Sequence, residues 1–208
     1  MKKTRRFFSI VTVLALSFAL MSPSFATYIG NSEQVSNGDT TTFTYICSPA
    51  EINAELSAQM KEIDELVSNL TRDVGEAYVE WGDPKTLPAS GYPGNQPKNG
   101  TYFSSAGGSF SYSDTGGSSV DLAFSFNAPF ASVSLSVPLG KITSGGSVSY
   151  NFNVPENSPG YYKLYITKWV EVKPYITYYR TGEGAPWEVA LKSYIKSTVK
   201  IDHEIEKV

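Results

Sequence analysis

The stretch from Ser48 to Trp81 constrains the fold more than any other part of the sequence. Apolar residues recur there in steps of four and three, which places them on one side of an α-helix. These residues are Leu56, Met60, Ile63, Val67, Leu70, Val74, Ala77 and Trp81. Ser48 and Glu51 form a Ser-x-x-Glu capping box, and the Gly-Asp-Pro sequence after Trp81 stops a helix. We expect one long amphipathic helix over about residues 48–81, with its apolar seam covered by the rest of the chain or by another copy.

The first 26 residues have the pattern of a secretory signal peptide. Basic residues precede an apolar run from Phe7 to Met21, and Ser24-Phe25-Ala26 supplies the small residues that signal peptidase recognises. A transmembrane anchor is the alternative, but this run is shorter than the roughly 20 residues that a bilayer requires. We expect a bacterial protein that is secreted outside the cell after cleavage near Ala26.

Removal of that segment leaves an acidic chain. Four of the 17 Lys and Arg residues lie in the segment, so 13 remain against 20 Asp and Glu, a net charge near −7. This charge makes nucleic acid an unfavourable partner. The remaining 182 residues suffice for one domain, or two small ones, with a real hydrophobic core.

Cys47 and His203 are the only cysteine and the only histidine. An intramolecular disulfide and a typical metal cluster are therefore excluded. Cys47 is expected to be a small buried residue beside the helix cap, with a reactive thiol or an intermolecular disulfide as the alternative. The sequence predicts no catalytic, cofactor-binding or metal-binding residue.

The rest of the chain is predicted to be β-structure. Residues 27–47 form an N-terminal strand or arm, 83–100 form a linker rich in Pro and Gly, and 101–208 form an antiparallel β domain. The predicted fold class is α+β, mainly antiparallel. One long helix packs on or beside a sheet or sandwich that includes a long C-terminal β-hairpin.

Within the β domain, residues 118–139 alternate serines with apolar residues on either side of a short turn. The apolar members are Val120, Leu122, Phe124, Phe126, Val133, Leu135 and Val137. One interpretation is an ordinary pair of strands with one buried face and one wet face. The other is a hairpin that enters a membrane, since each arm approaches the 9 to 11 or so residues of a membrane-spanning strand.

The C-terminal strands are rich in aromatic residues. Those that could stack on carbohydrate are Tyr161, Tyr165, Trp169, Tyr175 and Tyr179. The simpler explanation is cross-strand aromatic packing.

Three functions remain open at this point. The first is a non-enzymatic binding or structural role at or outside the cell surface, with cell-wall carbohydrate or a membrane as partner. The second is a membrane-active toxin or bacteriocin-like protein that uses hairpin 118–139, and a homo-oligomer could form through the 56–81 seam. The predicted architecture resembles elongated β-rich pore-forming toxins in shape, with its long strands, hydroxyl-rich hairpin and aromatic end. A secreted hydrolase is the third.

Overall fold

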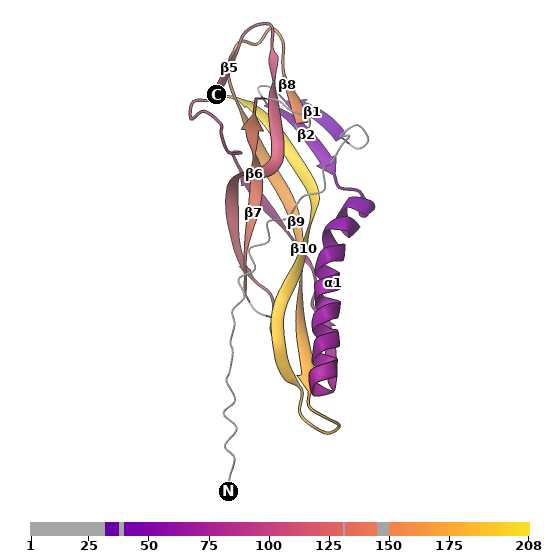
Figure 1. Cartoon of the computed structure of the whole chain (residues 1–208). Coiled ribbons are helices and arrows are strands. Elements are labelled where there is room, and N and C mark those ends of the chain that lie inside the picture. Colours follow the sequence, from indigo (N-terminus) through magenta and orange to yellow (C-terminus); the bar gives the residue numbers. More distant parts are fainter. Residues whose placement is uncertain (1–31, 38–39, 131, 145–149) are drawn as a thin grey trace.

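The computed structural model describes residues 32–37, 40–130, 132–144 and 150–208. The expected signal peptide and its cleavage site near Ala26 lie outside the described residues. The described part of the molecule is elongated, with the helix beside one half of a long sheet (Figure 1).

Helix α1 spans Pro49–Val74 and begins as the sequence predicts. Ser48 accepts a hydrogen bond from the backbone of Glu51, and the Glu51 carboxylate accepts one from the backbone of Ser48, which completes the capping box. The predicted end at residue 81 is wrong. The helix stops at Gly75, whose φ of 116° is accessible to glycine but strained for other residues.

The residues after Gly75 form strand β3, Glu76–Trp81, instead of continuing the helix. Ala77, Val79 and Trp81 alternate with more exposed residues, and β3 pairs antiparallel with a later strand. Ala77 and Trp81 are four positions apart, so they fit a helical seam as well as a strand face. Pairing with a long neighbouring strand decides between these two patterns.

The larger sheet has seven strands around a long central pair. The pair is β9, Gly160–Arg180, and β10, Glu188–Lys207, which run antiparallel along most of the molecule. The order is β1-β2-β10-β9-β3, where β1 is Ser32–Asn37 and β2 is Thr40–Ile46. Strands β4, Lys85–Gly91, and β5, Thr101–Phe103, also pair with β9.

Part of the segment predicted to be a linker, residues 83–100, forms strand β4. The segment is rich in Pro and Gly, but Lys85–Gly91 pairs with β9 over its whole length, and Ala89 is completely buried. Pro88 can be accommodated because β4 is hydrogen-bonded to β9 on one side only.

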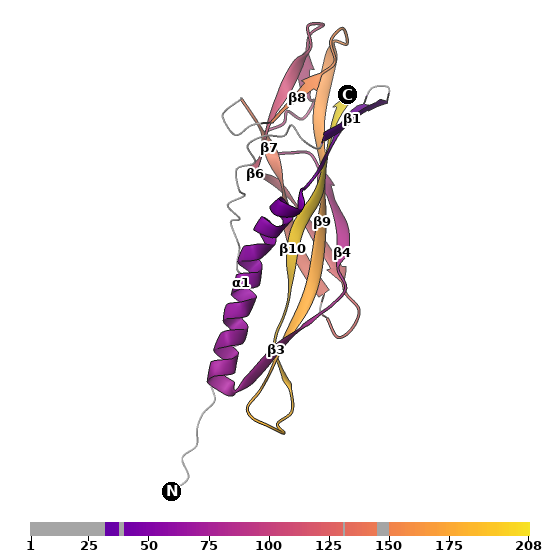
Figure 2. The same cartoon turned by 90° about the vertical axis from the view of Figure 1, so that its right-hand side faces the viewer.

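A second sheet of three strands packs on one face of the first. Its order is β7-β6-β8, with β6 at Gly108–Ser125, β7 at Ser132–Thr143 and β8 at Tyr150–Val154. Figure 2 shows β6, β7 and β8 on the upper part of the molecule and α1 beside the lower part of β9 and β10.

Three apolar clusters hold these layers together. The upper cluster joins Phe110 and Phe152 of the small sheet to Leu164 and Ile205 of the large one. The middle cluster joins the hairpin of β6 and β7 to β4 and β9. In the lower cluster, Ile63 of α1 packs on Tyr175 and Ile195, so the large sheet covers the centre of the helix seam.

Over the residues described, the fold is therefore mainly antiparallel β-structure with one helix, which agrees with the predicted α+β class at this level. In the described part of the chain, no helix combines the length and hydrophobicity needed to cross a membrane.

Candidate functional site

The lower arms of β6 and β7 form an amphipathic hairpin, here called the serine-rich hairpin, over residues 118–139. Leu122 pairs with Leu135 and Phe124 with Val133, while Ser125 pairs with Ser132 at the free end. Along β7, each serine is exposed and each apolar residue between them is buried. The hairpin thus has one hydroxyl-rich wet face and one apolar face.

The apolar face packs on the body of the protein. All seven apolar residues that the sequence singles out lie in the middle cluster: Val120, Leu122, Phe124, Phe126, Val133, Leu135 and Val137. They meet Ala89 of β4, Val170 and Val172 of β9, and Tyr194 of β10. The structure thus brings the predicted hairpin residues together, on the protein's own sheet.

Glycines interrupt both strands at the base of the hairpin. The register of the β6–β7 ladder shifts three times between Ser113 and Ser119, as expected for bulges. Gly116, Gly117 and Gly140 all have φ between 71° and 79°. A Cβ on Gly117 would overlap the carbonyl oxygen of Gly140, so the two strands approach too closely there for any other residue. We call these three glycines the glycine hinge.

A buried ion pair ties the chain beside the hinge to the large sheet. Nζ of Lys168, which is 4% exposed, lies 2.5 Å from Oδ1 of Asp114. The Tyr112 hydroxyl lies 2.8 Å from the same oxygen and 3.0 Å from the carbonyl oxygen of Leu139. A charge that is removed from water is costly unless an opposite charge compensates it. The Lys168–Asp114 ion pair therefore holds the residues beside the glycine hinge against β9.

The free end of the hairpin is held by the rings of Phe126 and Phe130, which pack in the middle cluster, and by three hydrogen bonds to the body. Lys85 and Lys192 donate hydrogen bonds to the carbonyl oxygens of Ser125 and Pro129, and Tyr194 donates one to Ser134. These three bonds lie at exposed positions, where water competes for both partners.

The outer edges of the serine-rich hairpin have no strand beside them in the described part of the chain. Over residues 132–139 strand β7 pairs only with β6, its bridge to Gly94 lying beyond the hairpin at Lys141, and β6 pairs with β8 only over Gly108–Tyr112. Both edges therefore present backbone groups that could pair with another strand.

The five aromatic residues proposed for carbohydrate stacking do not form one surface. Tyr161 is half exposed and packs edge-on against Tyr102, and Tyr165 packs against Tyr92. Trp169 donates a hydrogen bond to Asp202 and is covered by the Lys200 amine.

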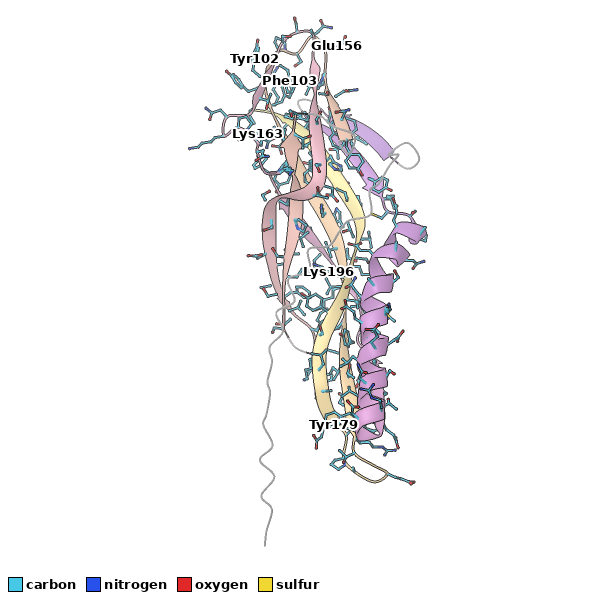
Figure 3. All side chains as sticks on the ribbon, viewed as in Figure 1. Tyr102, Phe103, Glu156, Lys163, Tyr179 and Lys196 are labelled. Carbon is cyan, nitrogen blue, oxygen red and sulfur yellow. The ribbon has the colours of Figure 1, made fainter. Side chains whose placement is uncertain are left out.

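The other two of the five lie lower in the molecule. Tyr175 is buried beneath the helix, where its ring meets Trp81. Tyr179 lies at the opposite end of the molecule from Tyr102, where it donates a hydrogen bond to Glu188 (Figure 3). Cross-strand and helix packing thus account for most of these aromatic residues.

Cys47 and His203 are both buried. Burial, together with Glu51 and Glu55, raises the pKa of the Cys47 thiol to about 12, so a helix N-terminus does not activate it. The His203 ring stacks on Phe152 at 4.4 Å between ring centres. Burial, and secondarily the Lys168 charge, lowers the pKa of His203 to about 3.

Sequence reasoning found the hairpin but missed the residues that hold it. Lys168 carried a usable signal, because it lies on the apolar parity of β9 between Ile166 and Val170. A lone lysine at such a position must find a buried partner. Lys85, Lys192 and Tyr194 had no such signal, because their roles depend on which strands become neighbours.

Comparisons with protein-family models, with curated proteins and with solved structures find no match to this chain. The function of this protein is therefore inferred from the geometry of the site.

Proposed function

We propose that this protein acts on membranes, and that the serine-rich hairpin leaves the body and enters a bilayer after several copies assemble. A single observation carries the proposal: an amphipathic hairpin with open edges folds back on the body below a glycine hinge, and the hydrogen bonds at its free end lie at exposed positions. In the proposal the protein is exported, cleaved near Ala26 and acts without catalysis. Nucleic acid is not a partner.

The length and pattern of the two arms support insertion. Ser118 to Phe126 has nine residues and Phe130 to Leu139 has ten, close to the 9 to 11 or so of a membrane-spanning strand. In the folded protein the apolar face meets Val170 and Val172. In a bilayer the same face would meet lipid chains and the serines would line water, so the apolar residues would stay out of water in both states.

The open edges of the hairpin explain why assembly must accompany insertion. A single hairpin in lipid would leave the backbone groups of both outer edges without hydrogen bonds, at a cost of several kcal/mol each. In neighbouring copies, the backbone groups at these edges would form hydrogen bonds with one another. This requirement places the contact between copies at the hairpin edges, since the helix seam is already covered at Ile63.

A non-enzymatic binding role outside the cell is the second candidate. One observation favours it: Tyr102 and Tyr161 are 58% and 50% exposed and lie with their ring centres 5.4 Å apart. Loss of binding to insoluble cell-wall carbohydrate in the Tyr161→Ala variant would support this role.

Dye release from liposomes tests the membrane proposal. Phe124 lies on the apolar face but is only partly buried, so Phe124→Asp should leave the protein folded and abolish release. Ser134→Asp is the matched control, because Ser134 is exposed on the wet face opposite Ala123. It should retain release and shift ion selectivity toward cations. Circular dichroism verifies that both variants are folded. Equal release by both variants, or no release by the unmodified protein, would contradict the proposal.

A further inference from the structure

The end of the molecule formed by the β9–β10 connection carries an unusual group of exposed apolar side chains. Tyr78, Trp187, Val189 and Leu191 are 41%, 40%, 48% and 39% exposed. All four come from β3, from the start of β10 or from the residue before it. Figure 1 shows the connection between β9 and β10 at the lower extremity of the molecule, where a flat partner could reach it.

Three rings at this end are packed into a fixed arrangement, here called the aromatic end cluster: Tyr78, Tyr178 and Trp187. The Tyr78 ring stacks on Tyr178 at 5.1 Å, and Trp187 meets Tyr78 edge-on at 4.7 Å. The Arg180 guanidinium lies 4.8 Å from the centre of the Trp187 ring and is paired with Glu76. The cluster is thus held in place before any partner binds.

The charges around the aromatic end cluster restrict which kind of lipid surface it can bind. The Glu76 carboxylate neutralises Arg180, and Lys192 donates its hydrogen bond to the hairpin at Pro129. Glu188 directly follows Trp187, and Glu183 lies in the same connection between β9 and β10, so both add negative charge to this end of the molecule. Anionic lipid headgroups would therefore gain little here. Trp and Tyr side chains instead favour the interfacial layer of a bilayer, where the ring is apolar and its polar edge stays hydrated.

We propose that the aromatic end cluster, with Val189 and Leu191, docks on the headgroup layer of a zwitterionic phospholipid bilayer. The inference builds on the proposed membrane function, to which it adds the contact surface and the lipid class. Docking itself requires only the cluster and no movement of the hairpin.

Docking through the aromatic end cluster would bring the serine-rich hairpin near the bilayer, because the two lie close together along β10. Lys192 of β10 contacts the hairpin at Pro129 and is five residues from Trp187. At about 3.3 Å per residue, Lys192, which contacts the free end of the hairpin, lies roughly 16 Å from Trp187 along β10. Docking therefore holds the hairpin close to the bilayer, with its free end directed toward the lipid.

Co-flotation with phosphatidylcholine vesicles tests the inference. Trp187→Ala should lower the partition coefficient for the vesicles at least 10-fold, because it removes the exposed indole ring of the cluster. Tyr161→Ala is the matched control, an exposed aromatic residue at the other end of the molecule, and should change binding less than 2-fold. Phosphatidylserine in the vesicles should not strengthen binding.

The Phe124→Asp variant separates docking from insertion. Binding to phosphatidylcholine without dye release in this variant would support both proposals. Dye release that survives Trp187→Ala would overturn docking and leave insertion standing. Three other results would also overturn docking: wild-type binding by Trp187→Ala, binding that requires phosphatidylserine, or lipid-free self-association that Trp187→Ala abolishes.

Discussion

Lys168 and Asp114 form an ion pair that joins β9 of the large sheet to β6 of the small one, two residues before the glycine hinge begins. Both side chains are largely withdrawn from water, so each depends on the other for compensation of its charge. The pair thus holds the part of the chain from which the serine-rich hairpin would swing.

Lys168→Met should therefore destabilise the protein strongly, because, among the residues described, it leaves the charge of the Asp114 carboxylate without an opposite charge, with only the Tyr112 hydroxyl as its hydrogen-bond partner. We expect a loss of about 3 to 5 kcal/mol in the free energy of unfolding, measured by urea denaturation. Lys168→Met combined with Asp114→Asn should recover much of this loss. Equal stability of the single and double variants would show that the pair is not coupled.

The glycine hinge should tolerate alanine at one position and not at its neighbour. A Cβ on Gly117 would overlap the carbonyl oxygen of Gly140, whereas a Cβ on Gly116 would meet only the Lys141 amine, at 4.0 Å. Gly116→Ala should cost about 1 to 2 kcal/mol for its positive φ alone. Gly117→Ala should cost clearly more in the same thermal or urea unfolding experiment. A smaller loss for Gly117→Ala than for Gly116→Ala would refute the close approach of the strands.

The helix seam should behave as part of the protein's own core. Ile63 is 4% exposed against Tyr175 and Ile195, whereas Met60 on the same seam is 36% exposed. Ile63→Ala should cost about 2 to 5 kcal/mol, and Met60→Ala should cost much less. Sedimentation velocity on both variants provides a check on assembly. A change in molecular mass without a change in stability would assign the seam to contacts between copies.

His203 should make the protein less stable in mild acid. Its pKa is about 3 in the folded protein and 6.5 in the unfolded chain, so below pH 6.5 the unfolded chain binds the additional proton. Stability is then lost as pH falls from 6.5 toward 3, by up to about 1.4 kcal/mol per pH unit.

His203→Phe should flatten the dependence of unfolding free energy on pH between 6.5 and 4.5. Asp202→Asn serves as the control. Burial opposes ionisation of Asp202, but hydrogen bonds from Lys200, Thr44 and Trp169 outweigh it and lower its pKa. The contribution of Asp202 to folding stability is therefore lost only when the pH falls below the usual pKa of an aspartate. An unchanged pH dependence in His203→Phe would exclude the histidine as its source.

The local signals in the sequence were sufficient for the helix start and for the hairpin. The Ser48–Glu51 capping box involves residues three apart, and the alternation along β7 reflects one buried face, so both can be recognised without the tertiary structure. The helix end could not be recognised in this way, since Trp81 fits both a helical seam and a strand. The long edge of β9 resolved that ambiguity by pairing with Glu76–Trp81.

The contacts that hold the hairpin are long-range and could not be predicted. Tyr194 and Ser134 are 60 residues apart, and Lys192 and Pro129 are 63 apart. Such contacts depend on strand order, which alternation alone does not define. Leu135 was predicted to be either buried or in lipid, and its 2% exposure against the body describes the folded state before any insertion.

The most direct test of the central claim is the position of the hairpin in the presence of lipid. Single cysteines at residues 132 to 137, in a Cys47→Ala background, would carry a fluorescent label, and lipids with nitroxide-labelled chains would quench it. Insertion should give alternating quenching, strong at Val133, Leu135 and Val137 and weak at Ser132, Ser134 and Ser136. Quenching that is absent at all six positions, although the protein is bound to the vesicles, would show that the hairpin stays on the body and would contradict the account.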